Sequence, residues 1–159
     1  LGLYLWGPPG TGKTHLAVAG LLEQLSNHRH GQYVSVRDLT LRARESFRDG
    51  NRPLSTLLAE CIQTDVLLLD DIGSAKNTEF STCEVILGVI DRAYGGRRPQ
   101  LIVTSNLDLA ALGRRLDERV ADRIRELCAV VKLGGVSYRR RVAAAREGRG
   151  AQVSGDGHP

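Results

Sequence analysis

Short apolar runs alternate with amphipathic stretches along the chain, a pattern that predicts strands and helices in turn. The apolar runs are too short for helices and suit buried strands, expected at residues 3–6, 32–36, 65–71, 100–106 and 127–133. Helical periodicity or helix-start signals lie between them, and we expect helices at residues 15–25, 38–48, 53–62, 78–94 and 107–112 and after Gly113. This order allows a parallel five-stranded sheet with helices on both faces.

Several helix ends carry specific predictions. Asp38 is expected to cap its helix, and Gly95 with Gly96 to end the helix that begins at Thr78. In that helix an apolar stripe should face the core, formed by Cys83, Ile86, Leu87, Ile90 and Tyr94. A further helix should open at Ser137 and fade near Glu147, followed by a glycine-rich, polar tail at 148–159 that we expect to be disordered.

A glycine-rich loop follows the first predicted strand and precedes the first helix. It fits the pattern G-x-x-x-x-G-K-[ST], known as Walker A, with the residues Gly7, Pro8, Pro9, Gly10, Thr11, Gly12, Lys13 and Thr14. Its glycines let backbone N–H groups surround the phosphates, Lys13 reaches the β- and γ-phosphate oxygens, and the Thr14 hydroxyl can ligate Mg²⁺. His15 then begins a helix whose positive N-terminal end faces the same anion. The sequence therefore predicts a nucleoside triphosphate site with Mg²⁺.

Two carboxylates end the most apolar predicted strand. In proteins with such a loop, the carboxyl end of a neighbouring strand lies beside the γ-phosphate. We therefore expect Asp70 to be the Walker B residue that holds Mg²⁺, and Asp71 to orient or deprotonate the attacking water. The alternative is a purely structural role, in which both carboxylates cap the start of the next element.

The strand that begins at Gln100 ends in polar residues. Asn106 can hydrogen-bond a γ-phosphate oxygen and the attacking water, although it could also cap the helix at 107–112. The next helix should be charged, and Arg119 and Arg123, four residues apart, should share one of its faces.

Composition limits the other options. The chain has 159 residues, 42% of them hydrophobic, which suits one globular domain, and its formal net charge of +4 is weak evidence for a nucleic-acid partner. A run of 18 apolar residues does not occur, so we expect no membrane span. The cysteines, three widely spaced residues in apolar sequence, suit a reduced core and a cytoplasmic location: Cys61, Cys83 and Cys128. His28 and His30 are expected in a solvated turn. The chain starts without Met inside a strand signal, so an N-terminal part is expected to be missing.

The motifs, in this order, resemble the AAA+ ATPases of the bacterial helicase-loader and transposition-helper group, the DnaC-like and IstB-like proteins. The resemblance covers about residues 1–140 and rests on these segments: 7–17, 67–73, 104–106, 119–124 and 137–139. It implies an α/β fold of the P-loop NTPase type, a three-layer sandwich with a five-stranded parallel sheet, as an ATPase core at residues 1–147.

The resemblance also implies roles for single residues. Asn106 would be the sensor 1 residue, and Arg123 the arginine finger supplied to the ATP of a neighbouring subunit, with Arg119 a second candidate. Arg139 would be a sensor 2-like arginine that reaches the γ-phosphate in its own subunit. A finger supplied in trans raises the rate by roughly 10³–10⁵, so a monomer should hydrolyse ATP slowly. Asp71 departs from the usual glutamate by one methylene, which favours slow turnover.

We therefore expect an ATP-hydrolysing accessory protein of DNA replication, of the helicase-loader type, that acts as a homo-oligomer with single-stranded DNA and a replicative helicase. The DNA would lie along a helical insert whose arginines otherwise form a solvated face: Arg37, Arg42, Arg44, Arg48 and Arg52. The alternative is a transposition helper that binds duplex DNA and recruits a transposase. A small-molecule kinase and a nucleotide-dependent scaffold that does not hydrolyse ATP remain as other classes.

Overall fold

A five-stranded parallel sheet forms the centre of the structure. The computed structural model describes residues 1–49, 54–74, 80–95 and 99–138. Its strands lie in the order β2-β3-β4-β1-β5, and every neighbouring pair is parallel. The α/β fold with a five-stranded parallel sheet predicted from the sequence is therefore confirmed.

The strands coincide with the apolar runs of the sequence. They are β1 Gly2–Trp6, β2 Gly31–Ser35, β3 Val66–Ile72, β4 Gln100–Ser105 and β5 Cys128–Lys132. In β3 the apolar side chains on both faces are fully buried, as expected for a parallel strand covered by helices on both sides. Four residues of the edge strand β5 are exposed.

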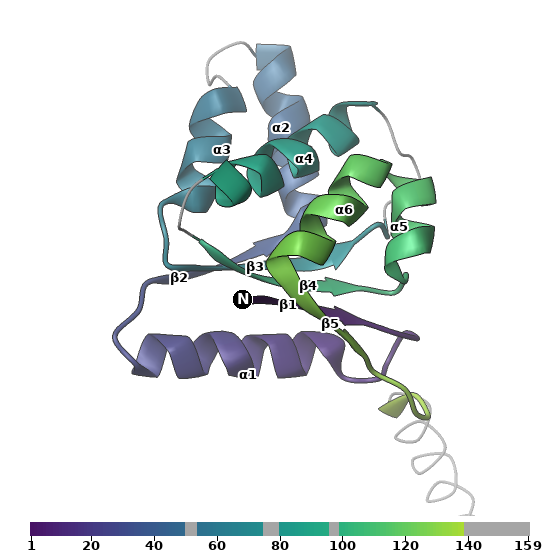
Figure 1. Ribbon diagram of the computed structural model, residues 1–159. Helices are drawn as coiled ribbons and strands as arrows, with labels where there is room; N and C mark the ends of the chain where they lie inside the picture. The colour runs from purple at the N-terminus through teal and green to yellow at the C-terminus, as the bar shows by residue number, and fades with distance from the viewer. Residues whose placement is uncertain (50–53, 75–79, 96–98, 139–159) are drawn as a thin grey trace, which may run out of the picture.

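Helices cover both faces of the sheet unequally (Figure 1). Among the described residues, α1 covers one face, and α2 to α6 gather over the other. The helices are α1 Lys13–Ser26, α2 Val36–Asp49, α3 Leu54–Ile62, α4 Phe80–Gly95, α5 Leu109–Arg115 and α6 Glu118–Leu127.

The alternation of side chains along each strand produces two apolar cores. On the α1 side, Val66 and Leu68 pack with Ala17 and Leu21 of α1. On the opposite side, Leu67 and Leu69 join a larger cluster with residues of α2 to α6. Because alternation continues along β3, Asp70 falls on the α1 side, toward the start of that helix.

The sheet order also determines where the polar motifs meet. β4 lies between β3 and β1, and all three strands end at the same edge of the sheet. The glycine loop follows β1, Asp70 and Asp71 lie at the end of β3, and Asn106 follows β4. Ligands of open α/β sheets bind beyond these carboxyl ends.

The first two helices begin earlier than the sequence predicts. α2 begins at Val36, and Asp38 lies in its first turn rather than at its cap. The Ser35 hydroxyl accepts a hydrogen bond from the Asp38 N–H at 3.4 Å and takes the capping position. α1 likewise begins at Lys13, two residues earlier than expected.

The prediction for the helices after β4 was also wrong in detail. Asp108 caps α5, its carboxylate accepting from the Ala111 N–H at 2.7 Å, so Asn106 is not the cap. Gly113 lies inside α5 rather than ahead of the charged helix. That helix, α6, begins at Glu118 after the capping residue Asp117.

The predicted stripe of α4 is only partly buried. Ile86, Leu87 and Ile90 face the core as expected, whereas Tyr94 is 44% exposed. Val85 and Val89, which were not part of the predicted stripe, are fully buried. The buried face of α4 is therefore rotated relative to the predicted stripe. The three cysteines are free thiols, as predicted, with Cys61 and Cys128 buried and Cys83 partly buried. Burial raises the pKa of Cys128 to about 12, which keeps this thiol protonated.

Some predictions concern residues outside the described ranges. The start of the helix at Thr78, the final helix from Arg139 onward and the tail at 148–159 belong here. Within the described part of the chain, none of the helices combines the length and the apolar character that crossing a membrane requires.

We expect the substitution Leu68→Ala to lower the free energy of unfolding by roughly 2–5 kcal/mol, because Leu68 is fully buried and its loss leaves a cavity in the central sheet. Chemical denaturation with urea measures this change. The same substitution at Leu16 of α1, which is 49% exposed, should cost about 0.5 kcal/mol or less. Equal effects at the two positions would contradict the assigned position of β3.

Candidate functional site

The loop between β1 and α1 contains backbone conformations that only glycine adopts easily. Gly10 has a φ of +83°, and a Cβ at this position would collide with the Ser137 side chain. The Tyr138 N–H donates to the Gly10 carbonyl at 3.0 Å. The segment after β5 therefore packs directly against the loop.

Lys13 lies inside the curve of this loop. Its side chain is 8% exposed, and its Nζ donates to the carbonyl oxygens of Gly7 and Pro8, both at 2.8 Å. α1 starts at Lys13 after Gly12, and within the described residues this N-terminus has no side-chain cap. A buried ammonium and a helix N-terminus therefore offer positive charge to an anion at this loop.

Asp70 accepts hydrogen bonds from hydroxyl groups of three different elements. Thr14 of α1 and Thr104 of β4 donate to its Oδ1 at 2.9 and 2.6 Å. Tyr33 of β2 donates to its Oδ2 at 2.9 Å. Partial desolvation of the phenol, together with this hydrogen bond and the charge of Asp70, raises the pKa of Tyr33 to about 12. The phenol therefore stays a donor toward Asp70 at neutral pH.

Asp71 adopts a left-handed backbone conformation with a φ of +62°, which is uncommon for a residue other than glycine. Its N–H donates to Thr104 Oγ1 at 2.9 Å, and its Oδ1 accepts from Asn106 Nδ2 at 3.2 Å. Asp71 and Asn106 thus form a pair at the ends of two neighbouring strands.

These groups surround one cavity of about 760 Å³, a size that suits a nucleotide-sized ligand. Its lining includes most of the predicted site residues: Pro9, Gly10, Thr11, Gly12, Lys13, Thr14, His15, Asp70, Asp71 and Asn106. Four further lining residues were missed from the sequence, namely Thr104, Gly134, Val136 and Tyr138. Gly7 and Pro8 take part through their carbonyl oxygens, which hold Lys13.

The oxygen atoms at the cavity suit Mg²⁺. Thr14 Oγ1 and Asp70 Oδ1 are 2.9 Å apart at its wall, and hard cations prefer such oxygen ligands. The described residues contain no cluster of three or more His, Cys, Asp or Glu side chains that could hold a metal by themselves. Mg²⁺ typically takes one or two protein ligands and completes its shell with water and substrate phosphates, so the residues present fit this ion.

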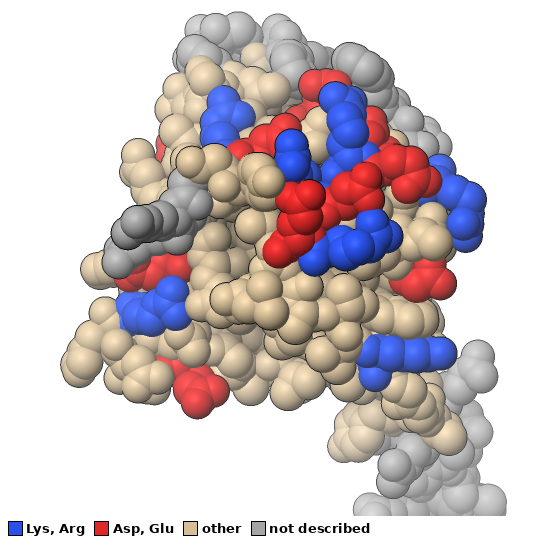
Figure 2. Space-filling view, viewed as in Figure 1, with Lys and Arg blue, Asp and Glu red and all other residues tan. Residues whose placement is uncertain are grey.

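The two candidate arginines of α6, Arg119 and Arg123, lie outside the lining of this cavity. Figure 2 shows exposed charges of both signs on this side of the molecule. Arg123 pairs with Asp91 at 3.3 Å and Glu126 at 3.4 Å, and its guanidinium lies 4.0 Å from the centre of the Tyr94 ring. Arg119 pairs with Asp117 at 2.9 Å, and its hydrogen bonds lower the pKa of that carboxyl.

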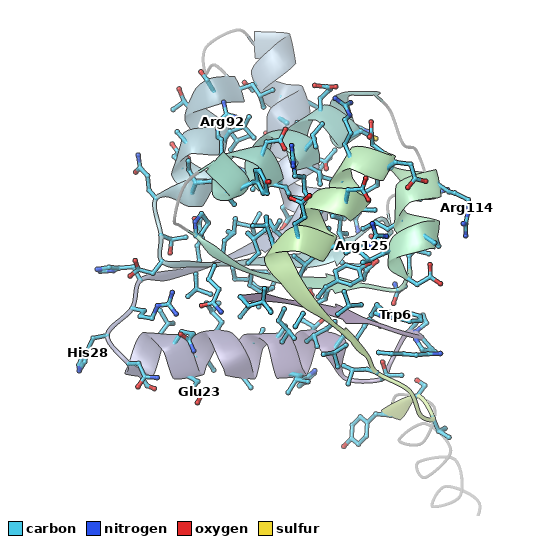
Figure 3. All side chains as sticks on the ribbon, viewed as in Figure 1. Trp6, Glu23, His28, Arg92, Arg114 and Arg125 are labelled. Atoms are coloured by element: carbon cyan, nitrogen blue, oxygen red, sulfur yellow. The ribbon has the colours of Figure 1, made fainter. Side chains whose placement is uncertain are left out.

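The remaining sequence candidates lie away from the cavity or outside the description. Figure 3 shows His28 beyond the C-terminal end of α1 and Trp6, which directly precedes the glycine loop, on the opposite side of the molecule. Arg37 and Arg42 of α2 are exposed, and Arg42 lies 3.7 Å from Glu60. Arg139, Arg52 and the side chain of Arg48 fall outside the described residues.

A glycine loop after β1, carboxylates at the end of β3 and a polar residue after β4 in this sheet order define the P-loop AAA+ class of proteins. The profile of the IstB-like ATP-binding protein family matches residues 2–145, and the chain belongs to this family. The resemblance stated from the sequence motifs is thereby confirmed.

Individual relatives agree with this assignment. The chain is 31% identical over 119 residues to the replicative helicase loader DnaC of Escherichia coli, covering 75% of this chain and 48% of that protein. It is 28% identical over 146 residues to the putative ATP-binding protein of insertion sequence IS5376 from Geobacillus stearothermophilus, covering 89% and 56%. The chain thus spans about half the length of the curated relatives it matches.

Solved structures share the fold. A crystal structure of the DnaC helicase loader has a TM-score of 0.73 at 30% identity, covering 84% of this chain and 78% of that one. AMPPCP-bound DnaA from Aquifex aeolicus has a TM-score of 0.69 at 21% identity over 92% of this chain and 45% of that one, which shows a common fold.

We expect Gly10→Ala to abolish or strongly weaken ATP binding, because the added methyl meets Ser137 and the left-handed backbone disfavours alanine. Isothermal titration calorimetry with ATP and Mg²⁺ measures the loss. Gly20→Ala, in the middle of α1, is the matched control, since its new methyl makes only an ordinary van der Waals contact with Ile102 of β4. It should leave binding unchanged and stabilise α1 by up to about 1 kcal/mol. Wild-type affinity in Gly10→Ala would contradict the assigned loop geometry.

Proposed function

We propose that this chain is the ATPase part of a DNA-replication accessory protein of the helicase-loader type, which binds ATP with Mg²⁺ and hydrolyses it. One observation carries this proposal: the glycine loop, the Thr14–Asp70 contact and the Asp71–Asn106 pair surround the same cavity. The likeness to the DnaC helicase loader supports the choice of process.

In this proposal the loop amides and the first turn of α1 bind the phosphates, and Lys13 neutralises the β- and γ-phosphate oxygens. The low exposure of Lys13 supports this role, since water screens a buried ammonium poorly. Thr14 and Asp70 would hold Mg²⁺, which when bound neutralises charge that develops on the phosphate oxygens.

Asp71 and Asn106 act on water at the other end of the phosphates. Asp71 accepts a proton from the attacking water while the water oxygen forms a bond to the γ-phosphorus. The bond from that phosphorus to the bridging oxygen of ADP breaks in the same step. Asn106 orients the water and a γ-phosphate oxygen, which its contact with Asp71 supports. Because aspartate is one methylene shorter than glutamate, we expect slow turnover.

Arg123 is proposed to act on the ATP of a neighbouring subunit in a homo-oligomer. It is exposed enough to reach another molecule, and its present partners, Asp91 and Glu126, are themselves half exposed. Water screens exposed ion pairs, which therefore stabilise little, so Arg123 can exchange them for a phosphate at small cost. Arg119 is the second candidate, and Arg139 is the proposed sensor 2-like arginine.

Single-stranded DNA and a replicative helicase are the proposed partners. The exposed arginines of α2, Arg37 and Arg42, support contact with DNA phosphates. Replication takes place in the bacterial cytoplasm, which is therefore the proposed location.

A transposition helper is the second candidate function, in which the ATP-bound protein binds duplex DNA and recruits a transposase. Two observations favour it: the IstB-like family profile covers residues 2–145, and the IS5376 relative aligns with 89% of the chain. ATPase assays with matched single-stranded and duplex DNA distinguish the two candidates, because the favoured DNA should stimulate turnover more strongly.

Subunit mixing tests the composite site. Lys13→Ala should abolish ATP binding, while Arg123→Ala should keep binding and lose turnover by roughly 10³-fold or more. Each variant then lacks what the other supplies, so mixed oligomers should hydrolyse ATP well above the sum of the separate variants. Arg125→Ala is the control, since Arg125 is exposed on the same helix and pairs with Asp122. Turnover is measured as phosphate release over several protein concentrations.

Normal turnover by assembled Arg123→Ala would show that Arg123 is not the finger. Phosphate release to water without an acceptor would exclude a small-molecule kinase, and multiple turnover would exclude a scaffold that does not hydrolyse ATP.

A further inference from the structure

The end of β3 contains a register shift that changes how its two carboxylates face β4. Leu69 pairs with Val103 and Ile72 with Ser105, so Asp70 and Asp71 both lie opposite a single residue, Thr104. Such a bulge inserts one residue and redirects a side chain.

The apolar pattern explains why the shift occurs at this point. Leu69 and Ile72 belong to the same core cluster on the face of α2 to α6, although regular alternation would put residues three apart on opposite faces. Burying both residues therefore requires one additional residue between them. Asp71 takes this position, with the left-handed φ of +62°.

The Thr104 hydroxyl is both a hydrogen-bond donor and a hydrogen-bond acceptor at the bulge. It donates to Asp70 Oδ1 at 2.6 Å and accepts from the Asp71 N–H at 2.9 Å. Thr104 is 1% exposed, so water cannot readily replace the hydroxyl at either contact. One buried group thus connects the proposed Mg²⁺ ligand with the proposed base.

We propose that Thr104 is a positioning residue that holds Asp70 and Asp71 in their relative orientation and so tunes Mg²⁺ affinity and turnover. This inference depends on the proposed ATPase function. Asp70 keeps hydrogen bonds from Thr14 and Tyr33 without Thr104, whereas the Asp71 N–H loses its acceptor. Loss of the hydroxyl should therefore loosen the backbone of the bulge at Asp71 and leave the phosphate-binding loop unchanged.

The test compares Thr104→Val, which keeps the shape and removes the hydroxyl, with Thr104→Ser, which keeps the hydroxyl and removes the methyl. Binding of a fluorescent ATP analogue is measured in EDTA and across a Mg²⁺ titration. Thr104→Val should bind the analogue in EDTA as wild type does, need roughly tenfold more Mg²⁺, and lose roughly 10–100-fold in kcat with little change in KM. Thr104→Ser should behave as wild type.

Hydrogen exchange gives a readout without nucleotide or metal. In Thr104→Val the Asp71 amide should exchange at least about tenfold faster than in wild type, because its acceptor is gone. Thr40→Val is the matched control: Thr40 is buried in α2, its hydroxyl donates to the Val36 carbonyl at 2.8 Å, and it lies outside the lining of the cavity. This variant should keep wild-type Mg²⁺ dependence, kcat and Asp71 exchange.

Wild-type behaviour of Thr104→Val, or equal losses in Thr104→Val and Thr104→Ser, would overturn the inference, since packing would then matter rather than the hydroxyl. If Thr104→Val does not fold, Thr104→Ala provides the same comparison with Thr104→Ser. A wild-type protein that does not bind the analogue with Mg²⁺ would overturn the proposed function as well, which separates the two failures.

Discussion

The hydrogen bond between Thr14 and Asp70 joins the two halves of the site, the phosphate-binding loop with its helix and the carboxylates at the end of β3. Thr14 lies in the first turn of α1, and Asp70 near the end of β3, with β4 between β3 and β1 in the sheet. The contact forms because the glycine loop returns the chain beneath the sheet and because alternation along β3 directs Asp70 to that face. A nucleotide in the loop is thereby brought next to a carboxylate from a distant part of the sequence.

The parts of this arrangement that could be predicted are those determined by local sequence. Strand β3 is a run of buried apolar residues, and the loop from Gly7 to Thr14 has glycines where a tight phosphate-binding turn requires them. Each signal lies within a few residues, so no knowledge of tertiary neighbours is needed. The positions of Lys13, Asp70 and Asn106 at one edge then follow from the rule that parallel strands end together.

The parts that were missed depend on contacts between distant residues. Tyr33 and Thr104 reach Asp70 from two different strands, 37 and 34 residues away in the chain. The bulge at Asp71 depends on which residues of β4 oppose β3, and Tyr94 is exposed because Val85 and Val89 take the buried face of α4. One local signal was available: Leu69 and Ile72, three apart and both apolar, around two acidic residues.

The balance of charge around the cavity supports the proposal of a site completed by other groups. The described lining has two carboxylates, Asp70 and Asp71, and one ammonium, Lys13. Bound Mg²⁺ would offset the carboxylates, and Lys13 with the start of α1 would offset part of the triphosphate charge. Hydrolysis spreads further negative charge over the γ-phosphate oxygens, and arginine is the side chain that usually neutralises it. The described part of the lining contains no arginine. In the proposed mechanism Arg123 of a neighbouring subunit would supply the missing charge, and ATP turnover would then depend on assembly, whereas Arg139 of the same chain would supply it without assembly.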